Sequence, residues 1–453
     1  MRTIMSSPPL SSSRYDAGDE KSEKASSADL RKGNHGSTRS FPSSTGNPEN
    51  VPVVADCDYP EGGYGWAVVV AAGLFTFTTF GYFNSWVIFQ AYYQQHQLKE
   101  YSPSAISWIG STQYGLLCLL GIISGRFADR GYVRSQVLIG SVVFVATQFL
   151  IAEATEYWQL MLGQGIALGF SATFMFFPAA TTVPHYFQRK IGAAQGVFMC
   201  FGAVGSIVLP IFLNSLFAAV GYKWTMRILG FILLAMTGVA NLLLKTRLPP
   251  NQGNGKFFNF SAFKSTTYSL YVAAITISFF SINTVGIYIQ YAAMVDGIDP
   301  SIASYLVSIS NAGAVLGRMT AGPLCDYSGP INILIHYGVV AAATTYAWPH
   351  CKQQGSAIAI SVLYGIFSGG FEGLICAPAV AMAKRGDVGQ LIGMMLTLSA
   401  LAQFGGPPIA GVLVGAPGGF YAVAYYSGSV TLLACLLLVG SKYYGLRSVR
   451  GKY

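Results

Sequence analysis

Charge is what this sequence has least of. Only 10% of its 453 residues are Asp, Glu, Lys or Arg, whereas 52% are hydrophobic. Soluble globular domains carry about 25% charged residues, so the composition excludes an ordinary soluble enzyme. The deficit is also uneven, because residues 1–58 hold 15 of the 45 formal charges. The rest of the chain has the composition of a protein that crosses a membrane many times.

Signals for metal binding and for catalysis are missing as well. The seven cysteines form no CxxC pair and no His/Cys set at zinc spacing, so we expect no metal and no disulfide framework. Of the five histidines only His336 falls in an apolar run, and no acid–base or nucleophile constellation appears. A nucleotide-binding loop is absent too. We therefore expect neither an enzyme nor an ATP-driven pump, and no cofactor.

Long apolar runs alternate with short polar breaks from residue 64 onward. A hydrocarbon core about 30 Å thick requires a helix of about 20 residues. The runs therefore predict an all-α membrane protein with twelve crossing helices. Their predicted ranges are 64–90, 105–125, 135–153, 158–180, 191–213, 224–244, 267–292, 302–323, 331–347, 357–379, 389–413 and 420–440.

The polar breaks divide the chain into five predicted parts. Residues 1–59 are rich in Ser and poor in apolar side chains, which predicts a disordered tail without a cleavable signal peptide. Two six-helix bundles follow, at 60–244 and 266–441, and the linker 245–265 joins them. Residues 442–453 form a short C-terminal tail.

Basic residues predict the orientation in the membrane. If the N-terminal tail lies in the cytosol, the inner segments carry 22 Lys and Arg residues and the outer loops carry 4. Positive residues favour the cytoplasmic side, so both termini and the 245–265 linker are expected there. The net charge of +9 thus reflects topology, and we expect no nucleic-acid partner.

A short motif occurs twice, at the same place in each predicted bundle. Gly125-Arg-Phe-Ala-Asp129-Arg130-Gly follows the second crossing, and Gly322-Pro-Leu-Cys-Asp326 follows the eighth, 197 positions later. The first copy resembles the loop motif of the major facilitator superfamily, and parallel repeats are the plan of that fold. The resemblance implies two six-helix halves around a central cavity. Gly125 would permit close helix approach, Asp129 would accept from a neighbouring helix N-terminus, and Arg130 would pair across a cytoplasmic gate. Asp326 would be the gating residue of the second copy.

Two further stretches narrow the resemblance. An acidic-Gly-Gly-aromatic-Gly-Trp sequence begins the first crossing, and a Tyr-Phe-x-basic-basic sequence begins the fifth. The matching residues are Glu61, Gly62, Gly63 and Trp66 in the first stretch and Tyr186, Phe187 and Arg189 in the second. As an ordered pair they resemble the two signatures of the monocarboxylate porter family, and the pattern is similar to its fungal members. The resemblance covers about residues 59–445.

The family's mechanistic residues carry over only in part. The resemblance implies that three positions would couple a proton to an organic anion. In the family these hold a lysine on the first helix, and an Asp and an Arg four positions apart on the eighth. Here the lysine position is Asn84 and the Asp position is Ala314, whereas Arg318 is retained. Lactate-type proton symport is therefore in doubt.

Arg318 and Glu372 are the charged residues predicted deep within crossings. A charge in a membrane span costs roughly 2.5 kcal/mol or more and suggests a function. The Arg318 guanidinium could bind a substrate anion, or it could extend to the interface. Glu372 could carry the coupled proton or pair with Arg318, or be a neutral group bonded to another helix. Asn311, on the same face as Arg318, is a candidate substrate ligand, and so are Asn84 and Asn283, although such residues commonly join helices instead.

Together these features favour a secondary transporter of a small organic anion that works by alternating access, with proton coupling left open. Export of a fungal secondary metabolite is the alternative within transport. A non-transporting membrane sensor on the same fold is the alternative of another class. We expect a monomeric transport unit whose partners are the lipid bilayer and a small organic anion or metabolite. The plasma membrane is preferred to the vacuolar membrane.

Overall fold

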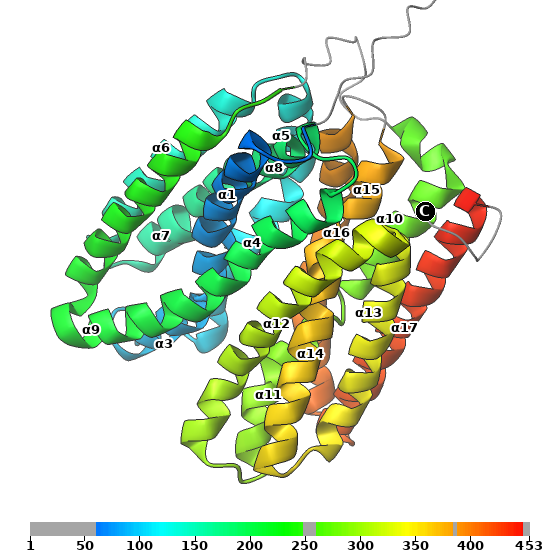
Figure 1. The fold of residues 1–453 in the computed structure, drawn as a ribbon. Coiled ribbons are helices and arrows are strands. Elements are labelled where there is room, and N and C mark those ends of the chain that lie inside the picture. The colour runs from blue at the N-terminus through cyan, green and yellow to red at the C-terminus, as the bar shows by residue number, and fades with distance from the viewer. Residues whose placement is uncertain (1–59, 248–259, 384–386, 447–453) are drawn as a thin grey trace, which may run out of the picture. The chain divides into compact units, whose positions relative to one another are not determined.

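The computed structural model describes residues 60–247, 260–383 and 387–446 (Figure 1). The predicted N-terminal tail, most of the predicted linker and the last seven residues of the chain lie outside these ranges. Residues from Asp58 onward form one compact unit. Below, residues 60–244 are called the N-terminal half and residues 266–446 the C-terminal half.

The described part of the N-terminal half consists of helices joined by short turns. Several of them follow one another directly, so that one predicted crossing contains two or more helical segments. The elements are α1 (Tyr64–Thr76), the π-helix η1 (Phe77–Gly81), α2 (Tyr82–Asn84), α3 (Trp86–Gln95), α4 (Pro103–Leu119), α5 (Gly121–Asp129), α6 (Val133–Ile151), α7 (Tyr157–Leu160), the π-helix η2 (Met161–Ala167), α8 (Leu168–Thr182), the 3-10 helix η3 (Val183–His185) and α9 (Ile191–Leu243).

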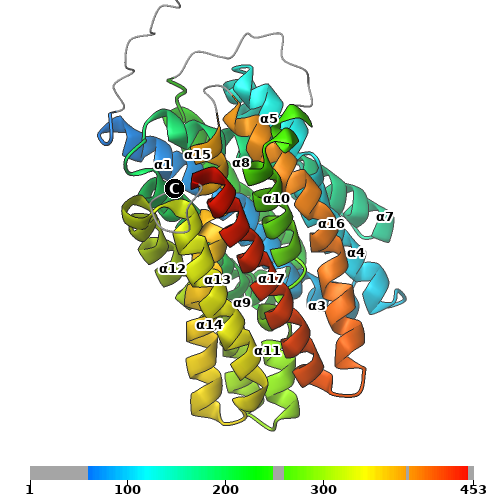
Figure 2. The same ribbon diagram turned by 90° about the vertical axis from the view of Figure 1, so that its right-hand side faces the viewer.

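The C-terminal half follows the same plan. Its elements are α10 (Thr266–Ser278), α11 (Thr284–Val295), α12 (Pro300–Ser328), α13 (Pro330–Ala347), the 3-10 helix η5 (Trp348–His350), α14 (Gln354–Leu374), α15 (Ala377–Met382), α16 (Val388–Val414) and α17 (Gly419–Leu446), after the 3-10 helix η4 (Phe260–Lys264). Helix α17 packs against α10 and α13 (Figure 2). It continues past residue 442, where the sequence predicted a tail to begin.

Eight helical stretches in the described residues are long and apolar enough to cross a membrane. One of them, α9, bends at Gly221, whose φ of 71° lies in the left-handed region that glycine adopts without strain. This helix therefore supplies both the fifth and the sixth predicted crossings. The remaining predicted crossings coincide with the α10–α11 pair, whose helices have 13 and 12 residues, and with α12 and α13. These are not among the eight, so the total of twelve stays a prediction.

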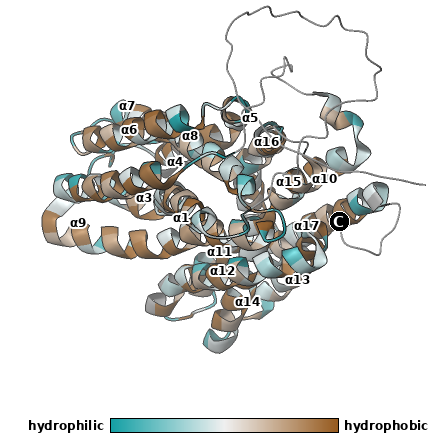
Figure 3. Cartoon of the chain, turned by 45° about the horizontal axis from the view of Figure 1, so that its top comes forward, coloured by the Kyte–Doolittle hydropathy of each residue, from teal (hydrophilic) through white to brown (hydrophobic). Residues whose placement is uncertain are grey.

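Large apolar side chains cover the outer faces of the helices. Leu242, Val412 and Leu150 are 79%, 74% and 72% exposed. Figure 3 shows hydrophobic residues along the length of α9 and on the other long helices. Soluble proteins rarely expose contiguous apolar surface on this scale, whereas lipid tails cover such a surface without cost. The exposed apolar residues are therefore those of a membrane protein.

Candidate functional site

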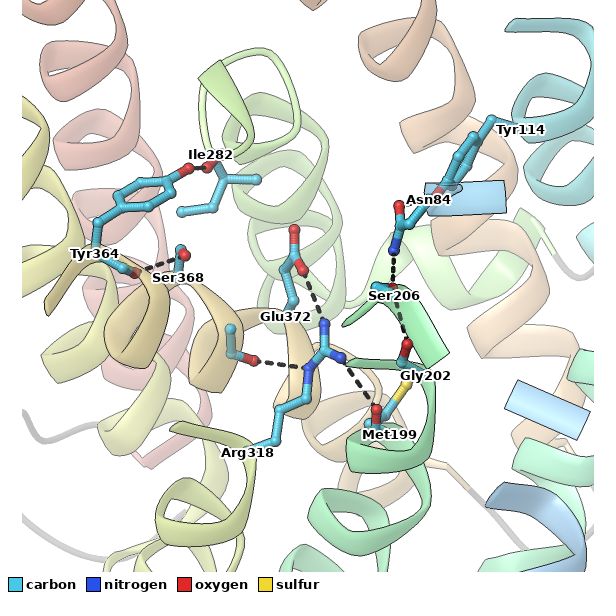
Figure 4. A network of polar contacts seen from close by, with 11 residues as sticks. Asn84, Tyr114, Met199, Gly202, Ser206, Ile282, Arg318, Tyr364, Ser368 and Glu372 are labelled. Atoms are coloured by element: carbon cyan, nitrogen blue, oxygen red, sulfur yellow. Dashed lines mark hydrogen bonds and ion pairs between the residues drawn. The ribbon is translucent and has the colours of Figure 1, made fainter. Parts of the chain in front are cut away.

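The two intramembrane charges form an ion pair. Arg318 on α12 donates from Nη2 to Oε2 of Glu372 on α14, at 3.1 Å. The same guanidinium donates from Nε to the Gly369 carbonyl, at 3.3 Å, and from Nη1 to the Met199 carbonyl on α9, at 3.1 Å (Figure 4). Its side chain is 13% exposed. Three protein acceptors therefore hold this largely buried guanidinium.

Close packing of α12 on α14 explains why the acidic partner is not at position 314. A Cβ atom added at Gly369 would lie 2.3 Å from the Cβ of Ala314, and one added at Gly317 would lie 1.9 Å from the Ile366 carbonyl oxygen. The two backbones are too close for a carboxylate between them. The acid that faces Arg318 therefore comes from the neighbouring helix, as Glu372.

A second polar group lies on the N-terminal half. Asn84 is exposed and sits where the first crossing is interrupted between α2 and α3. Its Nδ2 donates to Ser206 Oγ at 2.7 Å, and the Tyr114 hydroxyl donates to its Oδ1. Tyr114 is within electrostatic range of both Glu372 and Arg318. Figure 4 shows these residues together with the ion pair. Sequence reasoning found Asn84 but missed Tyr114 and Ser206, which have no charge to distinguish them from ordinary helix residues.

The corresponding interruption in the C-terminal half carries Asn283. This exposed residue precedes α11 and interacts with the Glu372 carboxyl group. The Tyr364 hydroxyl on α14 donates to the Ile282 carbonyl, which the interruption leaves without a regular helical partner. Asn311 is half-buried on α12, and the described contacts of Arg318 do not include it. The structure thus brings Asn283 to the ion pair but not Asn311.

The repeated motif joins the two halves at one end of the molecule. Asp129 Oδ1 and Oδ2 accept from the backbone N–H groups of Gly389 and Gln390, at 2.9 and 2.8 Å, where α16 begins. Asp326 accepts in the same way from Gly192 and Ala193, at 2.6 and 2.9 Å, where α9 begins. Each carboxylate therefore lies at the positive end of a helix in the other half.

Glycines bring the backbones into contact beside both carboxylates. A Cβ atom at Gly125 would lie 2.0 Å from the Gly389 carbonyl oxygen, and one at Gly192 would lie 2.5 Å from the Gly322 carbonyl oxygen. We call these contacts the α5–α16 seam and the α9–α12 seam. Figure 1 shows α5 and α16 meeting at this end, whereas α3 and α11 lie apart at the other. The structure is thus closed at the end that carries the two aspartates.

Arg130 is exposed just after α5. Arg126, one turn earlier in α5, is 1% exposed, and its positive charge acts on the Asp129 carboxyl group. Nothing in the neighbouring sequence marks Arg126 as a buried arginine, so sequence reasoning missed it.

The two signature stretches contact each other. Glu61 Oε1 accepts from the backbone N–H groups of Gln188 and Arg189, at 2.8 and 2.6 Å, and its Oε2 accepts from Lys190 at 3.1 Å. Burial raises the pKa of the Glu61 carboxyl, but these donors and the Arg189 charge outweigh it, so the pKa lies below its ordinary value. The stretch before α1 is thereby attached to the start of α9.

Aromatic and glycine residues of the signatures extend this contact. The rings of Trp66 and Phe187 pack edge to face with centroids 5.1 Å apart, and the Tyr186 hydroxyl donates to the Lys245 carbonyl at 3.0 Å. Gly63 precedes α1 with a φ of 56°, in the left-handed region that favours glycine. Gly62 does not have a positive φ, so its backbone conformation does not require glycine. The signatures therefore stabilise one end of the N-terminal half rather than lining the central polar groups.

Comparison with known proteins identifies the family. The sequence model of the Major Facilitator Superfamily matches residues 70–270 and, a second time, residues 271–449. The chain belongs to this superfamily. Its fold is similar to that of the human organic anion transporter MFSD10, with a TM-score of 0.70 at 12% identity over 83% of this chain and 99% of that one.

Two curated relatives are fungal efflux proteins. The chain is 35% identical to the aspyridones efflux protein apdF of Emericella nidulans over 401 residues, which cover 87% of this chain and 80% of the relative. It is 30% identical to the agnestins efflux protein AgnL12 of Paecilomyces divaricatus over 374 residues, which cover 82% and 86% of the two chains.

These findings confirm the predicted all-α major facilitator fold and a multi-pass integral membrane protein. Proteins of this superfamily are transporters rather than enzymes. The relatives are efflux transporters and not specifically monocarboxylate porters, so they favour the predicted alternative of export over uptake of a monocarboxylate.

Proposed function

We propose that this major facilitator protein exports a small organic metabolite across a fungal membrane by alternating access. The observation that carries the proposal is the 35% identity to an efflux protein over 87% of the chain. The missing aspartate at position 314 supports it, because the usual proton and anion relay of a monocarboxylate porter is incomplete here.

The central polar groups favour a substrate with an acidic head group. Arg318 can bind a carboxylate or an ionised enol with two parallel N–H bonds, which is the geometry that guanidinium favours. Asn84, held by Tyr114 and Ser206, offers further hydrogen bonds from the other half. Such a substrate would contact both halves, and alternating access requires this.

The predicted topology indicates which side of the membrane the closed end of the structure faces. With both termini in the cytosol, the closed end that carries Asp129 and Asp326 is cytoplasmic, so the structure corresponds to an outward-facing state. Asp129, Asp326, Gly125 and Arg130 would then act in gating. We propose a monomeric transport unit in the plasma membrane.

We propose that the resemblance to monocarboxylate porters reflects common descent and a shared architecture. It is supported by the direct contact of the two signature stretches through Glu61 and the backbone of Gln188–Lys190. It does not extend to the substrate, since Asn84 and Ala314 replace two of the three residues that the resemblance implies.

Metabolite comparison in cells tests the proposed export. Media and cell extracts are compared between a deletion strain and strains that overproduce the wild type or the Arg318→Gln variant. The wild type should move at least one acidic metabolite into the medium, and Arg318→Gln should not. Arg134→Gln, the same change at an exposed residue of α6, should behave as the wild type. No difference between the deletion and wild-type strains would contradict export.

Reconstituted vesicles test proton coupling separately, once a substrate is known. If Glu372 carries the coupled proton, Glu372→Gln should keep counterflow exchange and lose accumulation driven by a pH gradient. Accumulation that persists in Glu372→Gln would remove Glu372 from coupling, and pH-independent flux in the wild type would indicate a facilitator.

A further inference from the structure

Arg318 takes part in two contacts of different kinds. Within the C-terminal half it pairs with Glu372 and the Gly369 carbonyl, both on α14. Across the interface it donates to the Met199 carbonyl on α9, in the N-terminal half. One planar group therefore connects the central polar site to the contact between the halves.

The geometry makes these contacts depend on one another. A Cβ atom at Gly196 would lie 2.4 Å from the Arg318 carbonyl oxygen, so α9 and α12 touch at this level. Met199 lies nearly one turn further along α9, directly in reach of the guanidinium. Because the guanidinium is rigid and planar, the acceptors on α14 determine whether Nη1 points at α9.

We propose that Arg318 makes closure of the α9–α12 seam depend on the negative charge beside its guanidinium. With Glu372 ionised, the cation is neutralised and oriented towards Met199, and the seam is closed. With Glu372 neutral, a largely buried cation retains only neutral acceptors, which is costly unless water reaches it. Separation of α9 from α12 admits that water, so loss of the charge favours opening.

An acidic substrate has a defined place in this scheme, which rests on the proposed function. A carboxylate bound to Arg318 supplies the charge that a neutral Glu372 lacks, and so allows the seam to close around it. An uncharged analogue would bind without this effect. Arg318 is thus a positioning residue for the conformational step as well as a substrate ligand.

Other groups that face the pair do not carry a compensating charge. Those recorded near it are Tyr114 on α4, Tyr364 on α14, Cys200 on α9 and the amide of Asn283. In the described part of the chain, Glu372 is therefore the acidic group that decides the charge next to Arg318.

The backbone amides at the base of the seam report its closure directly. The N–H groups of Gly192 and Ala193 donate to Asp326 only while α9 and α12 are together. Hydrogen–deuterium exchange of the full chain in lipid nanodiscs, without substrate, measures how often these bonds open. Glu372→Gln should accelerate exchange at these amides about tenfold, since a hydrogen bond to a charged group is lost.

A second change gives the decisive comparison. Arg318→Gln added to Glu372→Gln removes the unpaired cation, so exchange should return to within about threefold of the wild-type rate. Thr397→Val is the matched control. The uncharged Thr397 hydroxyl accepts from the Ile122 N–H at 3.1 Å across the α5–α16 seam, so its removal weakens that seam without changing the charges. Its effect should multiply with that of Glu372→Gln, as independent sites do.

Two results would overturn the proposal. One is wild-type exchange in Glu372→Gln. The other is exchange in the double variant that is as fast as in Glu372→Gln or faster, which would mean that Glu372 acts by packing and not through Arg318. Because no substrate is present, either result leaves the proposed export untouched, and failure of export would not change these rates.

Discussion

The α5–α16 seam and the α9–α12 seam are built alike at their base and differently above it. At the base of each, an aspartate accepts from two amides at a helix start, and glycines let the backbones touch. Asp129 and Asp326 are 197 positions apart, and so are Gly192 and Gly389. The base contacts therefore follow the sequence repeat.

The next turn departs from the repeat. In the α5–α16 seam the Thr397 hydroxyl accepts from the Ile122 N–H at 3.1 Å and reaches the Cys118 carbonyl at 3.1 Å. It thus interrupts a regular hydrogen bond of the second crossing, where α4 gives way to α5. In the α9–α12 seam the position equivalent to Thr397 is Cys200, and Arg318 makes the contact instead.

An uncharged hydroxyl therefore makes this contact in the α5–α16 seam, whereas a charged guanidinium makes it in the α9–α12 seam. The contacts of Thr397 have the same strength whatever occupies the central site, whereas those of Arg318 depend on Glu372. The α9–α12 seam can therefore respond to the charge of a bound ligand, whereas the α5–α16 seam closes in the same way with or without a ligand.

Filling the glycine contacts should have the largest effect. In Gly125→Ala or Gly192→Ala the new Cβ would meet a backbone carbonyl, which cannot move aside as a side chain can. Overpacking of this kind costs about 1–3 kcal/mol, so transport should fall about tenfold or more in both variants. Gly238→Ala on α9 is the control, because no neighbour lies within 4 Å of its added Cβ. Efflux in cells measures all three, and normal efflux in either seam variant would show that its halves need not meet so closely.

Neutralising the aspartates should have a smaller effect that is equal at the two seams. Asp129→Asn and Asp326→Asn keep an acceptor but lose the charge at the helix N-terminus, at a cost of about 1 kcal/mol. Turnover in vesicles should slow about fivefold while substrate binding is unchanged, since neither residue lies near the central polar groups. Asp296→Asn, at an exposed residue after α11, serves as the control. Unchanged turnover in a correctly inserted Asp129→Asn protein would remove its role in gating.

Removing the Thr397 hydroxyl should have a modest effect. In Thr397→Val the Ile122 N–H can bond the Cys118 carbonyl directly, so part of the loss is recovered and the closed state is weakened by about 1 kcal/mol or less. Exchange of the Gly389 and Gln390 amides should accelerate about threefold. Thr397→Ser keeps the hydroxyl and should match the wild type. Equal exchange in Thr397→Val and Thr397→Ser would show that the inserted hydroxyl does not hold this seam.

Glu61 provides the smallest and most specific test, because its carboxylate attaches the stretch before α1 to the start of α9 within one half. Its pKa is lower in the folded protein than in the unfolded chain, so it stabilises the fold above its ordinary range near 4.5. That contribution is lost as the pH falls through the depressed pKa. The melting temperature of Glu61→Gln should lie below that of the wild type at pH 7, and the two should converge in acid. A constant difference down to pH 3 would assign the effect to packing.

Much of this architecture could be predicted from the sequence. The thickness of the bilayer fixes the length of an apolar run, so the predicted crossings coincide with helices of the structure, although their total of twelve stays a prediction. The cost of charge in the membrane made Arg318 and Glu372 conspicuous, and the repeated Gly-x-x-x-Asp motif pointed to Asp129 and Asp326 as a matching pair.

The contacts that distinguish the seams needed the tertiary structure. Thr397 meets Ile122 across 275 positions, and Arg318 meets Met199 across 119. Tyr114, Ser206 and Thr397 are uncharged residues of kinds that are common in membrane helices, so nothing local marks them. Sequence pattern determines which residues are compatible with lipid, because that depends on each residue's own transfer free energy. Which polar side chain reaches which backbone group depends on the distance between helices, and only the packing of small residues from both halves decides that distance.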